Sequence, residues 1–120
     1  MKIIFLLLST FVLASGADKT IVNGKWQVHS TVAGQESDAI CTFTQKETDL
    51  SGTCTTDQGT VNLIGAVDGK KISWSYKSQY EGTPLTVKFE GTLDSENKIT
   101  GTVSVPEFSV DGDFTAAPAK

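Results

Sequence analysis

The sequence contains no arginine: its ten basic residues are all lysines, against fourteen aspartates and glutamates, which gives a formal net charge of −4. Proteins that bind nucleic-acid phosphates or anionic membrane surfaces generally present clusters of basic side chains. An acidic chain without arginine does not have that basic footprint. We therefore expect no nucleic-acid partner.

Long apolar runs are missing from the chain except at its beginning. There, Lys2 precedes the apolar stretch Ile3–Leu13, and small residues stand at Ala14 and Gly16. This pattern is typical of a secretory signal peptide and is too short for a membrane span. We expect a signal peptide over residues 1–16, with cleavage after Gly16 or Ala17. The protein is thus predicted to be secreted or periplasmic, with no membrane anchor.

The part of the chain after the signal peptide is long enough for one small domain. A domain of about 100 residues buries roughly 65% of the surface of its unfolded chain, so its stability is marginal. The sequence predicts a tail over residues 17–23, a single β-domain over 24–116 and a C-terminal tail over 117–120.

Groups for acid–base or metal chemistry are scarce. His29 is the only histidine and falls on the polar face of a predicted strand, which indicates a surface residue. Asp111 and Asp113 share the outer face of another strand, without the spacing of an EF-hand calcium loop. We therefore predict no catalytic residue, no metal and no cofactor, and a protein that is not an enzyme. The alternative of an enzyme depends on three loop carboxylates: Glu36, Asp38 and Glu81.

Apolar and polar residues alternate with a period of two from Gly24 onward, and no segment has a sustained helical period. Such alternation is typical of antiparallel strands with one buried face. We expect eight strands, at residues 24–32, 39–46, 50–56, 60–67, 71–77, 84–93, 98–104 and 108–116.

Glycines interrupt the apolar face in the middle of the strands. Glycine weakens a flat strand, but it permits the coiling that closes a sheet into a barrel without open edges. The sequence therefore predicts an all-β, antiparallel up-and-down meander that closes into an eight-stranded barrel; a β-sandwich is the alternative. The glycines are Gly52, Gly65, Gly91, Gly101 and Gly112.

The connections alternate in character. Three are short, and one contains Asp68-Gly69, a type I′ hairpin signal. Four are predicted to be longer on average and more irregular. In an up-and-down barrel alternate connections lie at the same end, so we expect one closed end and one mouth. The connections expected at the mouth are Ala33–Asp38, Thr56–Gly59, Ser78–Thr83 and Pro106–Glu107.

Both cysteines fall within CTFTQKETDLSGTC, which could be a metal loop, a redox site or a covalent clip. A turn at Glu47-Thr48 would pair Cys41 with Cys54 on neighbouring strands. In an oxidising compartment we expect a disulfide there, which stabilises by roughly 3 kcal/mol on the loop-entropy argument. Two buried free thiols are the alternative.

Gly24-Lys25-Trp26 opens the first strand, and the phrases LSGT and ITGT follow. These features resemble the calycin barrels, which include lipocalins and avidins. The resemblance implies that Trp26 plugs the closed end of a ligand-binding barrel, although the arginine that stacks on this tryptophan in lipocalins is missing. The chain is also similar to bacterial periplasmic inhibitors of secreted metalloproteases, apart from its closer cysteines.

The apolar face carries most of the aromatic residues. It either packs solid or leaves a cavity for one small apolar ligand. We expect a secreted binding module for such a ligand; the alternative is a protein-interaction or inhibitor-like barrel that acts through its mouth loops or N-terminal tail. The predicted ligand-binding residues are Phe43, Trp74, Tyr76, Tyr80, Phe89 and Phe108.

Overall fold

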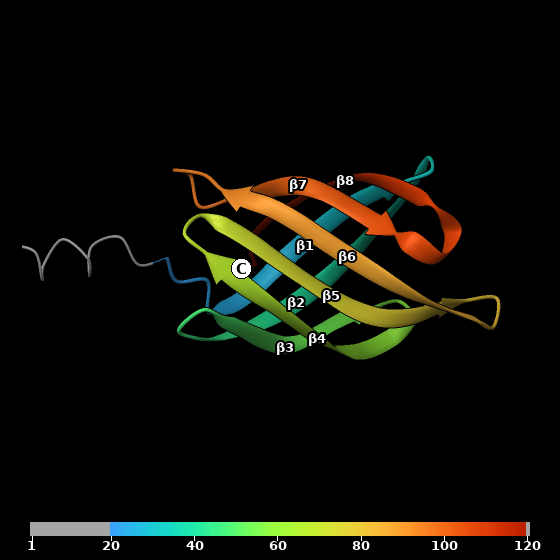
Figure 1. Ribbon diagram of the computed structural model, residues 1–120, viewed down its shortest axis with the longest axis horizontal. Coiled ribbons are helices and arrows are strands. Elements are labelled where there is room, and N and C mark those ends of the chain that lie inside the picture. Colours follow the sequence, from blue (N-terminus) through green and yellow to red (C-terminus); the bar gives the residue numbers. More distant parts are fainter. Residues whose placement is uncertain (1–19, 120) are drawn as a thin grey trace, which may run out of the picture.

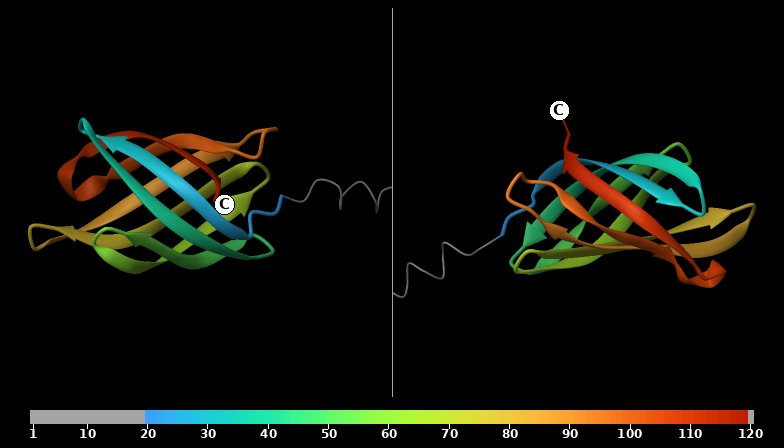
Figure 2. Two further views of the ribbon diagram at one scale, coloured as in Figure 1. Left: turned by 180° about the vertical axis from the view of Figure 1, so that it is seen from behind. Right: turned by 90° about the horizontal axis from the view of Figure 1, so that it is seen from above.

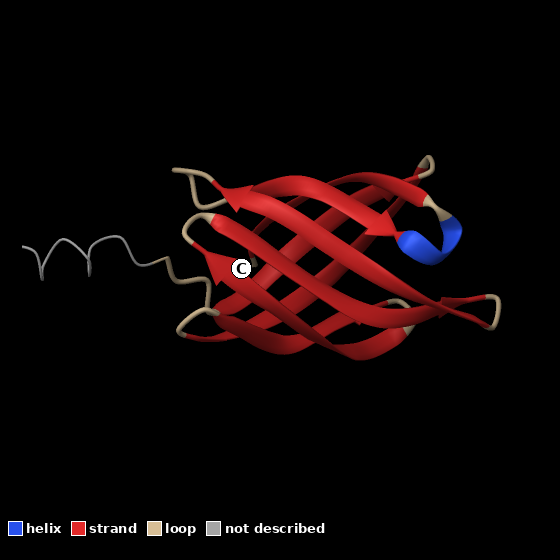
Figure 3. Ribbon diagram, in the orientation of Figure 1, coloured by secondary structure: helices blue, strands red, loops and turns tan. Residues whose placement is uncertain are grey.

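The computed structural model describes residues 20–119, so the predicted signal peptide lies outside the described residues. Eight antiparallel strands follow one another around a closed barrel, and the last pairs with the first (Figures 1 and 3). The predicted up-and-down barrel is thus confirmed, and the sandwich is excluded. Within residues 20–119, no helix is long and apolar enough to cross a membrane. The elements are β1 (Gly24–Val32), β2 (Gln35–Lys46), β3 (Asp49–Thr56), β4 (Gly59–Asp68), β5 (Lys71–Tyr80), β6 (Thr83–Leu93), β7 (Ile99–Val105), the 3₁₀ helix η2 (Pro106–Phe108) and β8 (Val110–Pro118).

Glycines on the inner face allow neighbouring strands to approach closely. Gly52 has a φ of 142°, and a Cβ there would overlap the carbonyl oxygen of Thr42 on β2. Phe43 lies directly opposite Gly52 in the register of β2 and β3, the arrangement in which an aromatic residue faces a glycine on the neighbouring strand. The predicted role of glycine in coiling the sheet therefore has a direct steric basis.

Three of the four connections at the mouth are shorter than predicted, whereas the β7–β8 connection is longer, because it holds η2 and Ser109. These three are two-residue turns, and in two of them, Ala33-Gly34 and Glu81-Gly82, both residues have positive φ. This is the pattern of a type I′ turn, whose twist matches that of the flanking strands. The polar residues on either side of each turn therefore continue the pairing of the two strands and do not form a loop. The turn after Asp68 has positive φ only at Gly69, so the predicted type I′ geometry is wrong there, and the pattern is that of type II′. Figure 2 shows the β5–β6 hairpin projecting past the other strands at the mouth.

The closed end is sealed by the segment that precedes β1. Val22 is only 1% exposed, and its carbonyl oxygen accepts a hydrogen bond from Trp26 Nε1 at 2.9 Å. Gln45 of β2 fixes the segment from the other side: its Oε1 accepts from the N–H of Val22, and its Nε2 donates to the carbonyl oxygen of Thr20. Trp26 is thus buried at the closed end.

Aromatic rings fill the middle of the barrel. Trp74 stacks on Phe89 with ring centroids 4.8 Å apart, and the edges of Phe43 and Phe114 close around it at 4.9 and 5.3 Å. The indole N–H of Trp74 is buried without a hydrogen-bond partner among residues 20–119, so ring packing holds this side chain. The interior is therefore solid at this level.

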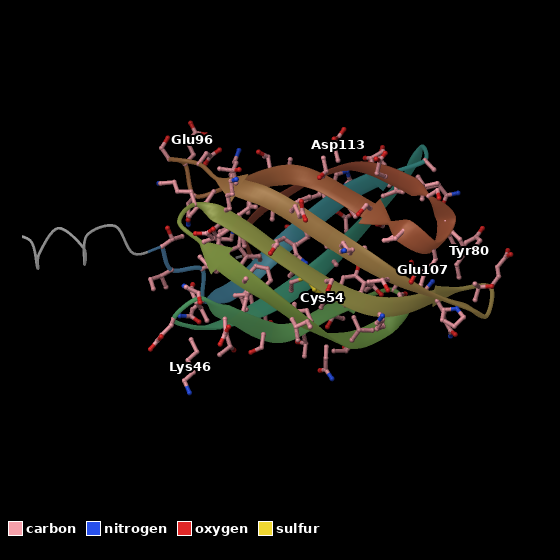
Figure 4. The ribbon with its side chains drawn as sticks, viewed as in Figure 1. Lys46, Cys54, Tyr80, Glu96, Glu107 and Asp113 are labelled. Atoms are coloured by element: carbon pink, nitrogen blue, oxygen red, sulfur yellow. A yellow bond between two sulfur atoms is a disulfide. The ribbon has the colours of Figure 1, made fainter. Side chains whose placement is uncertain are left out.

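The disulfide between Cys41 and Cys54 is confirmed. The two residues lie directly opposite each other on β2 and β3, in the register predicted from the turn at Glu47-Thr48. Both cysteines of the chain are in this bond, which excludes the alternative of free thiols. Both side chains are buried in the core, so the bond joins β2 to β3 from inside the barrel; Figure 4 labels Cys54.

Candidate functional site

A cavity of about 450 Å³ opens at the mouth, above the aromatic core. We call it the cup. Residues from β1, β2, β3, the β3–β4 turn, β5 and β6 contribute to it, so it is bounded by the barrel wall itself. Its volume lies within the range of small-molecule sites. The cup is lined by Val28, Ser30, Glu36, Ser37, Asp38, Ala39, Thr56, Asp57, Gln58, Tyr76, Ser78 and Phe89.

The cup exists because inward-facing side chains become small toward the mouth. On β2 the inward positions run from Phe43 and Cys41 to Ala39 and Ser37, so ring-sized side chains are replaced by a methyl and a hydroxymethyl group. On β1 the inward Ser30 is 8% exposed, and its Oγ lies 3.0 Å from the Oγ of Ser37. Space that aromatic rings fill in the middle of the barrel is left open here.

The floor of the cup is apolar and aromatic. Tyr76 and Phe89 lie with ring centroids 5.9 Å apart, and Phe89 rests on Trp74 below. Val28 of β1 completes the floor on the opposite side. Burial raises the pKa of the Tyr76 hydroxyl, so it stays protonated at neutral pH and can donate a hydrogen bond. The floor thus offers ring faces and one phenolic donor to a ligand.

The upper wall of the cup is polar. Hydroxyl groups of Ser37, Thr56 and Ser78 surround the space above the floor, and each can donate or accept. An occupant would therefore meet apolar surface at depth and neutral hydrogen-bonding groups nearer the solvent. Such a gradient suits an amphiphilic molecule better than a wholly apolar one.

Carboxylates mark the rim, and two of them bind a histidine on the outer surface. His29 Nδ1 lies 2.8 Å from Asp38 Oδ1, and its Nε2 lies 3.1 Å from Glu36 Oε1. The hydrogen bond to Asp38 raises the pKa of His29, and the charge of both carboxylates acts in the same direction. The imidazole ring thus joins β1 to β2 beside the cup.

The predicted ligand-binding residues divide into three groups. Tyr76 and Phe89 line the cup, whereas Phe43 and Trp74 are buried beneath it. Tyr80 is 53% exposed at the tip of the β5–β6 hairpin, where Figure 4 shows it at the mouth.

The placement of Phe108 on the inner face of the last strand is wrong. It lies in η2, is 41% exposed and contacts Tyr80 edge-to-face, with ring centroids 6.2 Å apart. The cause is Pro106, which begins a 3₁₀ turn, and Ser109, whose φ of 54° ends it before β8 starts at Val110.

Sequence reasoning missed the small and hydroxyl residues of the cup. Ser30, Ser37, Ala39 and Ser78 lie at positions predicted as strand ends or loops, although each continues the inward alternation of its strand. The signal that identifies them is that alternation, carried through polar residues up to the turn.

The carboxylates considered for catalysis do not converge. Glu36 and Asp38 bind His29, whereas Glu81 lies in the β5–β6 turn. Asp111 and Asp113 lie on β8, and Figure 4 places Asp113 on the outside of the barrel. Over residues 20–119, no group of three or more histidine, cysteine, aspartate or glutamate side chains is arranged to hold a metal ion.

Comparison of the chain with known protein families, with curated proteins and with solved structures found no match.

Proposed function

We propose that this protein is a secreted, non-enzymatic binding protein that holds one small molecule in the cup. The observation that carries the proposal is the change in the barrel interior, from solid aromatic packing around Trp74 to an open cavity of about 450 Å³ floored by Tyr76 and Phe89. Toward the mouth the inward positions of β1 and β2 carry Ser30, Ala39 and Ser37 in place of rings, which leaves room for a ligand above this floor. The resemblance of Gly24-Lys25-Trp26 and the eight-stranded barrel to calycin barrels agrees with this function.

Two features support export and the absence of catalysis. The Cys41–Cys54 disulfide suits an oxidising compartment, which is the destination expected from the predicted signal peptide. His29 lies on the outer surface, held by two carboxylates, so it does not activate the serine hydroxyls inside the cup. Binding without chemistry is the function that these groups support best.

The test is a titration of the oxidised protein with N-phenyl-1-naphthylamine, a neutral apolar dye whose fluorescence rises on leaving water. We expect saturable binding of one dye per chain. Ala39→Trp places an indole in the cup and should abolish binding. Ile40→Trp is the matched control, because it adds the same side chain to the neighbouring residue on the outer face of β2, and it should bind as the wild type does.

A second variant keeps the test decisive if Ala39→Trp does not fold. Ser37 is exposed at the top of the cup, so Ser37→Phe fills space there at the cost of one hydroxyl contact with Ser30, and it should also weaken dye binding. Far-UV circular dichroism and thermal unfolding establish that each variant is folded. The proposal is wrong if the wild type shows no saturable binding, or if folded Ala39→Trp and Ser37→Phe proteins bind the dye as tightly as the wild type.

A further inference from the structure

The barrel wall has a gap near the mouth, between β4 and β5. Pairing of these strands ends at Leu63 opposite Tyr76. β5 nevertheless continues to Tyr80 in its ladder with β6, and β4 begins at Gly59 in its ladder with β3. Residues 59–62 and 77–80 thus have a strand partner on one side only, and backbone N–H and C=O groups along these edges are left to bind something else.

A second cavity, of about 630 Å³, lies in this gap. It shares four of its lining residues with the cup, so the two cavities meet along the same side chains. A hydrogen bond of 3.4 Å from Ser78 Oγ to Gln58 Oε1 spans the gap from β5 to the β3–β4 turn. The bond is long and exposed, so displacing it costs little. The shared residues are Thr56, Gln58, Tyr76 and Ser78.

The chemistry of the gap differs from that of the cup floor. Its walls carry neutral hydrogen-bonding groups: the free strand edges and the side chains of Gln58, Ser78 and Gln79. A molecule with its apolar part on Tyr76 could extend a polar group between β4 and β5. Such a group would find both donors and acceptors there.

The charged residues around the two cavities disfavour an anionic head group. Lys77 is the only cationic residue among the lining residues of the cup and the gap, and its Nζ already donates to Thr86 Oγ1 at 3.0 Å. Four of the lining residues carry a carboxylate, so the lining has a net negative charge even though Glu36 and Asp38 pair with His29, and an anionic head group meets net repulsion. The carboxylates belong to Glu36, Asp38, Asp57 and Glu81.

We propose that the gap binds the neutral or cationic head group of an amphiphile whose apolar tail occupies the cup. This inference rests on the proposed function, because it extends the same site sideways and specifies its ligand class. A ligand that occupies both the cup and the gap is longer than the cup alone. Simple fatty-acid anions are then not the preferred ligands.

The test uses three ligands with the same tail, octan-1-ol, octyltrimethylammonium and octanoate, each competing with N-phenyl-1-naphthylamine at low ionic strength. We expect octanoate to bind about two- to five-fold more weakly than the other two, as expected for exposed charges, and the difference to shrink at 1 M salt. Gln79 lines the gap but not the cup. Gln79→Lys should narrow the difference, and Gln79→Glu should widen it.

Thr44→Lys and Thr44→Glu are the matched controls, because they change net charge equally on the exposed outer face of β2, away from both cavities. The inference is overturned if octanoate competes as well as octan-1-ol, or if the Gln79 variants shift the three affinities no more than the Thr44 variants do. In either case, the proposed function would still hold if the wild type binds the dye and Ala39→Trp abolishes that binding. Failure of the wild type to bind the dye would refute both.

Discussion

Replacing Gln45 with alanine is expected to release the segment that seals the closed end. The side chain of Gln45 accepts a hydrogen bond from the N–H of Val22 at 2.9 Å and donates to the carbonyl oxygens of Thr20 and Glu47, both at 2.8 Å. In Gln45→Ala the N–H of Val22 loses its acceptor at a residue that is almost completely buried. The segment must then either stay in place with an unpaired donor or move into solvent.

The size of the effect can be worked out from these contacts. Three hydrogen bonds contribute about 0.5–1.5 kcal/mol each, and those that involve exposed atoms lie near the lower limit. We therefore expect a loss of about 2 kcal/mol in the free energy of unfolding. For a domain of this size this corresponds to a decrease in Tm of roughly 10 °C, or to a decrease in the urea midpoint of about 1 M.

The assay is urea unfolding followed by tryptophan fluorescence. Gln27→Ala is the matched control, because Gln27 is an exposed glutamine on the neighbouring strand, and it should change stability by less than about 0.5 kcal/mol. Below the unfolding transition Gln45→Ala should still bind the dye as the wild type does, because the cup lies at the other end of the barrel. A stability loss no greater than that of Gln27→Ala would refute the assigned role of Gln45.

Three further predictions concern stability. Replacing Cys41 and Cys54 together by alanine should lower the free energy of unfolding by roughly 3 kcal/mol, as measured in urea. Gly52→Ala should lower the free energy of unfolding by about 3 kcal/mol, because a strained φ and steric overlap combine at this position. Gly34→Ala should lower it by about 1 kcal/mol, because Gly34 has a positive φ but open space around it. Equal losses in the two variants would contradict the steric argument. His29 has a pKa raised from 6.5 by its β2 carboxylate partner, so its stabilising effect is complete below pH 6.5 and disappears as pH rises through the folded-state pKa. Tm values of wild type and His29→Gln should therefore differ at pH 5.5 and converge at alkaline pH; a difference that grows with pH would contradict this.

Strand alternation made the barrel predictable from sequence. The inward-facing glycines and the pairing of Cys41 with Cys54 result from local rules of register, and the structure agrees with both. The lengths of the mouth connections were not predictable in the same way. Ala33-Gly34 and Glu81-Gly82 form tight turns only because a non-glycine residue in each adopts positive φ, which the sequence does not signal.

The candidate site was harder to predict than the fold. Aromatic residues identify the apolar face, but which rings are packed and which are accessible depends on neighbours across the barrel. Trp74 is enclosed because Phe43, Phe89 and Phe114 come from other strands. The gap between β4 and β5 depends on where pairing stops, and nothing in the sequence of either strand marks that point.

The first and last strands meet at the closed end of the barrel, and this has a consequence for how the barrel assembles. Ala119 donates its N–H to the carbonyl oxygen of Lys25, so the described ends of the chain meet at the closed end. Seven of the eight strand pairs form between consecutive strands, and only the pairing of β1 with β8 joins distant parts of the sequence. Ring closure is therefore the step that bears most of the entropic cost of long-range contact. In a circular permutant with these ends linked and the β3–β4 turn cut, the pairing of β1 with β8 would become local in sequence. The pairing of β3 with β4 would then join the distant parts of the chain and close the barrel last.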